Sequence, residues 1–142
     1  MTKVAYIRQN TGCNNISLTA VFSGNPSNIT IGNDSVIRDR CMIRFKHGKI
    51  AIGNNVVISH NVTLLAGEHN YSKKDVNILS QGMFEGETVI ENDVWIGSNA
   101  TVLSGVRIGK GAVIGSMSLV NRSVPDYEVW GGNPAKKLKS RC

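Results

Sequence analysis

Three histidines, His47, His60 and His69, are the side chains best suited to move a proton at neutral pH. A neutral imidazole can take the proton of an alcohol without help from a metal ion, so each is a candidate general base. His69 lies in a polar segment between residues 67 and 87, and such loops commonly carry functional groups. Most loop histidines are simply solvated, however, so the residue type alone leaves both interpretations open.

The three cysteines, Cys13, Cys41 and Cys142, are odd in number and far apart in the sequence. This pattern argues against a disulfide framework and favours a reducing compartment. The first ten residues lack the apolar run of a signal peptide, and no stretch approaches the length that crosses a bilayer. We therefore expect a cytoplasmic protein without a transmembrane segment.

The formal net charge is +6, and part of it gathers between Lys136 and Arg141. A solvated surface explains such a value, and an anionic ligand is the alternative, because clustered Lys and Arg attract phosphates. Nucleic acid is disfavoured as a partner, since the basic residues do not alternate with aromatic side chains on which bases could stack.

An aliphatic residue recurs every six positions, and four residues after each in the later part comes a small or β-branched residue. Such regularity is very unlikely by chance and indicates a repeat architecture. A three-residue insertion near His47 interrupts the earlier part of the series. The aliphatic residues are Ile31, Ile37 and Ile43, then Ile52, Ile58 and Leu64, and finally Ile90, Ile96, Val102, Ile108, Ile114 and Val120.

A period of six fits neither an α-helix nor an alternating strand. It predicts short strands separated by tight turns, with three sides forming a coil of about 18 residues and coils stacked about 4.8 Å apart. Gly and Asn in the Ile-Gly-Asn stretches suit corners with positive φ. We predict one all-β domain over residues 1–142, a parallel β-helix with irregular early coils in residues 1–30 and a loop extruded at about 67–87.

Two motifs make the resemblance to a known family specific. An Asn-Asp-Val-Trp-Ile-Gly-Ser stretch at residues 92–98 follows the histidine-bearing segment, and Gly-Gly-Asn-Pro-Ala-Lys at 131–136 follows the final repeat. Over residues 29–139 the chain resembles the hexapeptide-repeat acyltransferases, in particular the galactoside, maltose and polysaccharide O-acetyltransferase branch. The resemblance implies a left-handed β-helix, a short C-terminal tail for which a helix stays open, and a homotrimer with sites between subunits.

The resemblance further implies acetyl transfer from acetyl-CoA to a hydroxyl of a sugar or glycan precursor in polysaccharide biosynthesis, without a metal. His69 matches the loop histidine that deprotonates the acceptor, whose oxygen attacks the thioester while a hydrogen-bond donor stabilises the oxyanion. The residues at the coenzyme A-binding positions are Trp95, Ser98, Ser116, Asn121, Arg122, Lys136 and Lys139.

Three residues near the expected coenzyme A slot need separate interpretation. Trp95 either packs over the pantetheine arm or covers the side of a coil. Trp130 either stacks on adenine or covers the last coil. Met117 stands where the family usually has Gly, so we expect an altered or narrowed slot.

The acceptor side is less determined. Sugar-specific relatives carry an Asn or acidic residue on an early coil that holds the acceptor, and no such Asn is evident in residues 38–42. Asp39, Arg40, Arg44 and Tyr71 are candidate acceptor contacts, each equally compatible with a solvated corner. The two arginines favour an anionic sugar or a nucleotide-sugar.

Two other functions compete with acetyl transfer. γ-Class carbonic anhydrases use the same coil and bind zinc with three histidines across an interface. The spacings of thirteen and nine between His47, His60 and His69 do not match that family's one distant histidine plus a close pair. We interpret His60 as a surface or interface residue and His47 as structural, with a substrate role open. A noncatalytic scaffold, the other alternative, would need neither the loop histidine nor the basic tail.

Overall fold

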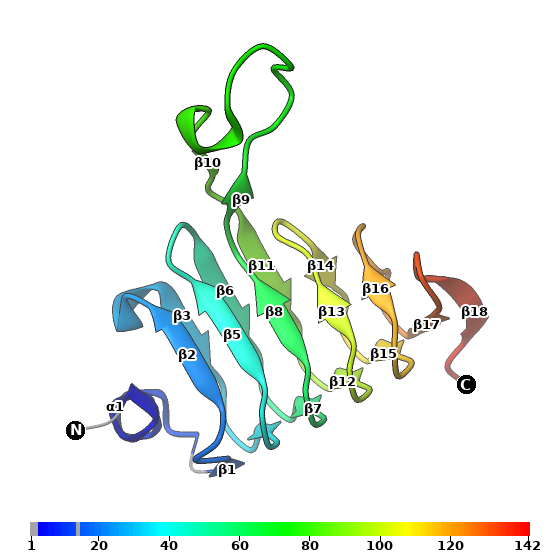
Figure 1. Cartoon of the computed structure of the whole chain (residues 1–142). Helices are drawn as coiled ribbons and strands as arrows, with labels where there is room; N and C mark the ends of the chain where they lie inside the picture. Colours follow the sequence, from blue (N-terminus) through cyan, green and yellow to red (C-terminus); the bar gives the residue numbers. More distant parts are fainter. Residues whose placement is uncertain (1–2, 14) are drawn as a thin grey trace.

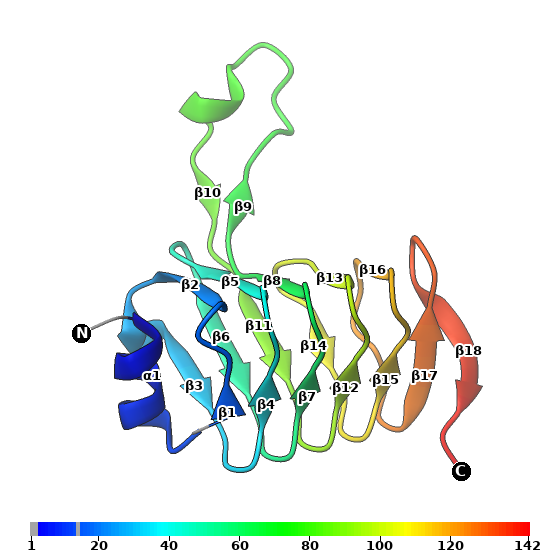
Figure 2. The same cartoon turned by 60° about the horizontal axis from the view of Figure 1, so that its bottom comes forward.

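The chain winds into stacked three-sided coils that form a parallel β-helix (Figures 1 and 2). The computed structural model describes residues 3–13 and 15–142. Side A contains β1 (Asn15–Ile16), β4 (Val36–Ile37), β7 (Val57–Ile58), β12 (Trp95–Ile96), β15 (Val113–Ile114) and β17 (Glu128–Gly131). Side B contains β2 (Val21–Gly24), β5 (Met42–Phe45), β8 (Thr63–Leu65), β13 (Thr101–Val102) and β16 (Leu119–Val120). Side C contains β3 (Ile29–Ile31), β6 (Lys49–Ile52), β11 (Glu87–Ile90) and β14 (Arg107–Ile108).

The inward side chains of each side form an apolar column through the coils. The twelve aliphatic residues predicted to recur every six positions are all buried. The strand register pairs each with its counterpart one coil away. A single coil could not exclude water from these side chains, so stacking creates the core. The columns are Ile16, Ile37, Ile58, Ile96 and Ile114 on side A, Phe22, Ile43, Leu64, Val102 and Val120 on side B, and Ile31, Ile52, Ile90 and Ile108 on side C.

At the corners from side C to side A the expected positive φ is found at an Asn of the Ile-Gly-Asn-Asn stretch but not at its Gly. Positive φ falls on the residue after the Gly-Asn pair, as at Asn55 (φ 56°), and not on Gly53 or Asn54. Asn92 Oδ1 accepts the backbone N–H of Asn54 in the adjacent coil at 2.8 Å. Glycine is required at position 53 because the coils approach closely, and a Cβ there would lie 2.3 Å from Asn92 Oδ1.

A helix, α1 (Lys3–Thr11), covers the open end of the first coil. The prediction of irregular coils for residues 1–30 is therefore wrong for this segment, although β1, β2 and β3 form the first coil. Val4 and Ile7 of α1 are buried against the core, which has no coil below to close it. Among the described residues, no helix is both long and apolar enough to cross a membrane.

The C-terminal tail is a strand and not the helix that we left open. This strand, β18 (Lys136–Ser140), pairs antiparallel with β17 and supplies backbone partners at the end of side A. Trp130 of β17 is 7% exposed and continues the side A column beyond Ile114. Hydrogen bonds from Lys137 and from the Trp130 indole lower the pKa of the Glu128 carboxyl.

The predicted extrusion is an ordered arm, residues 67–86, that projects from the corner between sides B and C (Figures 1 and 2). Its base is a two-stranded antiparallel ladder of β9 (Glu68–His69) and β10 (Met83–Phe84), and its far part contains a 3-10 turn, η2 (Ile78–Ser80). The Gln81 carboxamide binds the backbone of Lys73 and Val76. These bonds let the arm keep its shape without packing on a core.

Gly53→Ala should lower the free energy of unfolding by about 2 kcal/mol, because the added Cβ meets the side chain and backbone of Asn92 in the next coil. Gly115→Ala is the matched control, since the nearest atom to a Cβ there is the Trp130 carbonyl oxygen at 3.5 Å. Urea unfolding at one protein concentration compares the variants. Equal losses in both would show that coil approach does not select glycine.

Candidate functional site

Hydroxyl groups of the coils fix the root of the arm. The buried Thr88 hydroxyl donates to the carbonyl of Leu65 at 2.6 Å and accepts the N–H of Gly105 at 3.2 Å. The Ser104 hydroxyl accepts the N–H of Gly67 at 2.7 Å. Both ends of the excursion are therefore tied to neighbouring coils, so the position of β9 follows from the coil stack.

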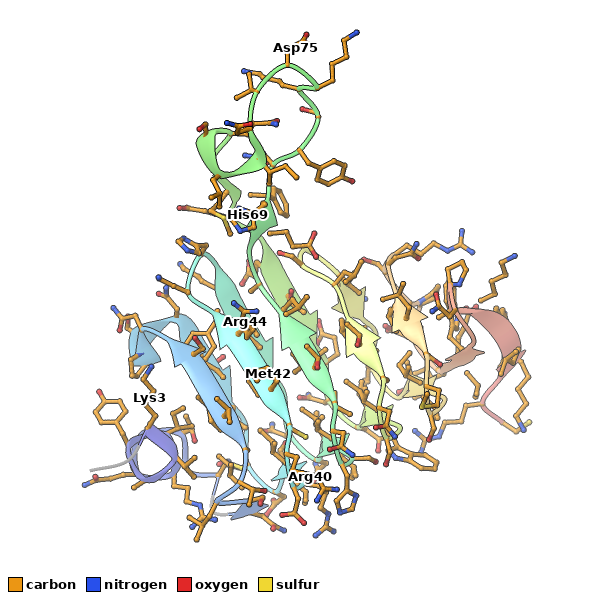
Figure 3. All side chains as sticks on the ribbon, viewed as in Figure 1. Lys3, Arg40, Met42, Arg44, His69 and Asp75 are labelled. Carbon is orange, nitrogen blue, oxygen red and sulfur yellow. The ribbon has the colours of Figure 1, made fainter. Side chains whose placement is uncertain are left out.

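His69 of β9 faces a hollow of about 400 Å³ beside this root, here called the His69 hollow. Figure 3 shows His69 at the base of the arm, above Arg44 on side B. The imidazole is exposed, and among the described residues no hydrogen-bond partner holds it. It is therefore accessible to a ligand and free to accept a proton from one. The lining residues are Arg44, Lys46, His47, Leu65, Ala66, Gly67, Glu68, His69 and Met83.

Three of the predicted coenzyme A-binding residues meet at the other end of the β-helix. Asn121, Arg122 and Lys136 line a hollow of about 190 Å³ together with Pro134 and Ala135, here called the tail hollow. Two cationic side chains in one hollow suit a phosphate-bearing ligand.

Trp130 lies beneath the tail hollow, in the core. The Arg122 guanidinium lies 5.1 Å from its ring centroid, within range of a cation–π contact. Because the ring is buried, Trp130 covers the last coil, and the alternative of an adenine-stacking surface is not supported within this chain.

Trp95 and Lys139 line a third hollow, of about 600 Å³, on the outer surface of side A. The Trp95 side chain is 53% exposed, and its indole N–H donates to Ser59 Oγ at 3.1 Å. Val57, Val113 and Val129 are among its apolar lining residues. Trp95 therefore covers the side of the coil and also borders a space that a ligand or another chain could fill.

Ser98 and Ser116 lie in stacked turns at the corner between sides A and B. The N–H of Met117 donates to the carbonyl of Ser98 at 2.9 Å, which places the two serine turns one coil apart. Met117 has a φ of 65° and an exposed side chain. The Met117 side chain therefore lies on the surface beside the two serine turns.

Asp39 and Arg40 lie at this same corner in earlier coils, away from His69. Asp39 accepts hydrogen bonds from Ser17 and Thr19, the former lowering the pKa of its carboxyl most, and His60 Nε2 lies 3.8 Å away. Figure 3 shows Arg40 at the opposite end of side B from His69. Within one chain, Asp39 and Arg40 therefore do not join the His69 hollow.

Arg44 does line the His69 hollow, whereas Tyr71 lies farther out on the arm and is 77% exposed. Sequence reasoning did not select Lys46, Glu68 or Met83, which also line the hollow. It also interpreted His47 mainly as structural. The signal that could have found Lys46 and His47 is the three-residue insertion, because it widens the corner from which the arm leaves one coil later.

The described residues contain no group of three or more His, Cys, Asp or Glu side chains arranged to hold a metal ion. Cys13 and Cys41 are buried, and their thiols donate to the carbonyls of Ser35 and Ser59. Burial raises the pKa of both thiols, so they behave as apolar core groups.

Comparison with known sequences finds one matching family and several similar proteins. Residues 87–122 match the family described as bacterial transferase hexapeptide (six repeats). A chloramphenicol acetyltransferase of Klebsiella aerogenes is 64% identical over 56 residues, 39% of this chain and 27% of that protein. The Bacillus subtilis protein YvoF is 41% identical over 93 residues, 66% of this chain and 49% of that protein. A mitochondrial gamma carbonic anhydrase of Arabidopsis thaliana is 34% identical over 121 residues, 78% of this chain and 43% of that protein. The chain spans between about a quarter and a half of these relatives.

Solved structures share the whole architecture. A hexapeptide-repeat acetyltransferase of Vibrio cholerae overlays with a TM-score of 0.84 at 27% identity, covering 97% of this chain and 78% of that one. The same protein in complex with acetyl coenzyme A gives a TM-score of 0.80. A galactoside acetyltransferase in complex with coenzyme A gives 0.78 at 28% identity, covering 97% of this chain and 69% of that one. The predicted left-handed parallel β-helix is confirmed.

Thr88→Val should lower the free energy of unfolding by about 2 kcal/mol, because the Leu65 carbonyl and the Gly105 N–H lose a buried partner. Hydrogen exchange of the Gly105 amide should accelerate more than the average of the core. Thr101→Val is the control, since that hydroxyl makes no hydrogen bond to the described residues. A Thr88→Val protein as stable as the control would contradict this account of the arm's root.

Proposed function

We propose that this chain transfers the acetyl group of acetyl-CoA to a hydroxyl of a sugar or glycan precursor, which the match of residues 87–122 to the bacterial transferase hexapeptide family and the similarity to a solved hexapeptide-repeat acetyltransferase support. The observation that carries the proposal is the position of His69. An unpaired imidazole at the fixed base of the arm faces a hollow of about 400 Å³, roughly the space that small-molecule sites provide. We place the reaction in polysaccharide biosynthesis in the cytoplasm, where three free thiols would stay reduced.

In this reaction His69 acts as general base. It takes the proton of the acceptor hydroxyl, whose oxygen attacks the thioester carbonyl carbon and gives a tetrahedral oxyanion. The carbon–sulfur bond then breaks, and the imidazolium returns the proton to the departing coenzyme A thiolate. No residue is acetylated, and the chain's contribution is to place the base and both substrates.

The tail hollow supports binding of the acetyl donor. Arg122 and Lys136 would face phosphate groups of coenzyme A, with Asn121 beside them. The stacked serine turns would lie along the pantetheine arm, and Met117 would narrow its path. Solved relatives that bind acetyl-CoA or coenzyme A support this choice of donor.

We propose that the site is shared between copies in a homotrimer. In the described part of the chain, the His69 hollow contains none of the predicted donor-binding residues. Exposed apolar side chains lie on side A, at Val57 and Trp95, and on the arm, at Ile78 and Leu79. Such surfaces on a folded chain commonly mark association.

A zinc-dependent carbonic anhydrase is the second candidate, because one relative carries that name and because His47 and His69 line the same hollow. His60, however, lies beside Asp39 at a different corner. Stoichiometric zinc in purified protein would contradict the acetyltransferase proposal. A noncatalytic scaffold predicts that millimolar coenzyme A leaves the melting temperature unchanged.

His69→Gln should lower kcat for acetyl transfer by about 100-fold to 10,000-fold, because the hydroxyl loses its base. The affinity for acetyl-CoA should stay within about 2-fold, as expected for a residue that acts on the acceptor. Thiol release from acetyl-CoA with a panel of sugars measures the rate, with His60→Gln as the control. Equal rates in wild type and His69→Gln would remove His69 from the mechanism.

Replacing both Arg122 and Lys136 by Gln should weaken coenzyme A binding by about 10-fold to 100-fold, because two charge-assisted contacts to phosphate are lost. Isothermal titration calorimetry measures the affinity at two salt concentrations. The affinity of the wild type should fall more steeply with salt than that of the double variant. Lys110→Gln removes one exposed charge from another corner as the control. Unchanged affinity in the double variant would place the donor elsewhere.

A further inference from the structure

Two cations face the His69 hollow without partners of their own. Arg44 and Lys46 line the hollow, and neither makes an ion pair or side-chain hydrogen bond with a described residue. Two other arginines are held by carboxylates: Arg107 pairs with Glu91 at 3.1 Å, and Arg141 pairs with Asp93 at 2.9 Å. A guanidinium and an ammonium in one hollow, neither neutralised, produce a local positive potential.

The coil stack fixes the location of these cations. In the β5–β8 ladder, Arg44 is the register partner of Leu65, and the N–H of Ala66 donates to the Arg44 carbonyl at 2.8 Å. Side chains alternate along β5, so Arg44 points outward between the buried Ile43 and Phe45. The position of Arg44 therefore follows from strand pairing, and Figure 3 shows this residue on side B below His69.

His47 is held at the same place by close backbone packing. Gly67 has a φ of 105°, and a Cβ on it would lie 2.7 Å from both the Cβ and the carbonyl oxygen of His47. His47 therefore cannot move away from the arm's root without breaking that contact. An imidazole N–H here can donate to an anion that sits between Arg44 and Lys46.

The carboxylate in the hollow does not cancel these charges. Glu68 Oε1 accepts the backbone N–H of Ser104 at 3.4 Å, so one of its oxygens is directed to the coil. Glu85 and Glu87 line the adjoining hollow on side C, together with Lys49, and not the His69 hollow, whereas Lys46 and His47 line both hollows. The charged side chains of the His69 hollow are thus Arg44, Lys46 and Glu68, with a formal sum of +1 when both histidines are neutral.

We propose that the acceptor carries a phosphate or carboxylate group, which Arg44 and Lys46 bind while His69 faces the hydroxyl that is acetylated. Arg44 can hold either anion through two parallel N–H donors, and Lys46 adds a point charge. The inference rests on the proposed function for the reaction, although the anion site itself can be tested without turnover. Arg40, the other arginine considered for this role, donates to Asn61 at a different corner.

The test compares galactose, galactose 1-phosphate and galacturonate, and the corresponding glucose compounds, as ligands in calorimetry and as acceptors in thiol release. Wild type should bind one charged class at least about 10-fold more tightly than the neutral sugar. The phosphate and carboxylate members show which anion the site takes. Replacing Arg44 and Lys46 together by Gln should abolish the preference, whereas Lys49→Gln, on the adjoining hollow, should retain it.

Two outcomes would overturn the inference: neutral sugars bound as tightly as charged ones, or a double variant that keeps the preference. A double variant that loses coenzyme A affinity to the same extent would also overturn it, because the cations would then serve the donor. Thiol release with neutral sugars alone would sink the inference and leave acetyl transfer standing. Anion binding that depends on Arg44 and Lys46, without thiol release for any acceptor, would support the anion site and count against the proposed reaction.

Discussion

Hydrogen bonds between the backbones of successive coils are the interaction on which the rest of this structure depends. The N–H of Val57 donates to the carbonyl of Val94 at 2.9 Å, and the N–H of Trp95 donates to that of Ala112 at 3.1 Å. This pairing places equivalent positions of successive coils next to each other, so each inward aliphatic residue contacts its counterpart. A slip of one residue would turn an entire column outward, and the register is therefore strongly specified.

The same constraint decides where the chain can leave the stack. The corners between sides C and A, and between A and B, repeat with little variation, because each turn hydrogen-bonds to the turn of the next coil. The corner between sides B and C is different. It holds the insertion at residues 46–48 and, one coil later, the arm, whose root is fixed by Thr88 and Ser104. The accessible imidazole and the unpaired cations thus gather at the irregular corner.

The six-residue period was sufficient to predict the sides, the core columns and the extruded segment, because burial inside a stacked coil imposes that period directly. It could not predict α1, since Val4 and Ile7 are the only side chains of the helix described as buried, and the helix closes an end that exists only in the folded coil. The strand at β18 was missed for a related reason: its partner is the free edge of β17. The role of Gly53 was also misjudged, because the close approach of Asn92 comes from residues far along the chain.

The candidate site was only partly accessible from the sequence. The positions of residues relative to the two family motifs selected His69 and the residues of the tail hollow. These positions could not show that Arg44, and not Arg40, lies near His69. They are four residues apart, yet Arg44 lies on β5 below His69, whereas Arg40 lies at the corner before β5, away from His69 (Figure 3). Lys46 and His47 lie in the insertion, which has no counterpart in the regular repeat. Such residues can be assigned to a site only when the coil that faces them is known.

The central claim is that the His69 of one copy works with the tail hollow of another, and subunit mixing tests it most directly. His69→Ala chains and chains with both Arg122 and Lys136 changed to Gln would be unfolded together, reassembled, and assayed at low acetyl-CoA. Activity well above the sum of the two separate proteins is the predicted result, because an intact base then faces an intact tail hollow. Activity that never exceeds that sum would contradict the claim and place the whole site within one chain.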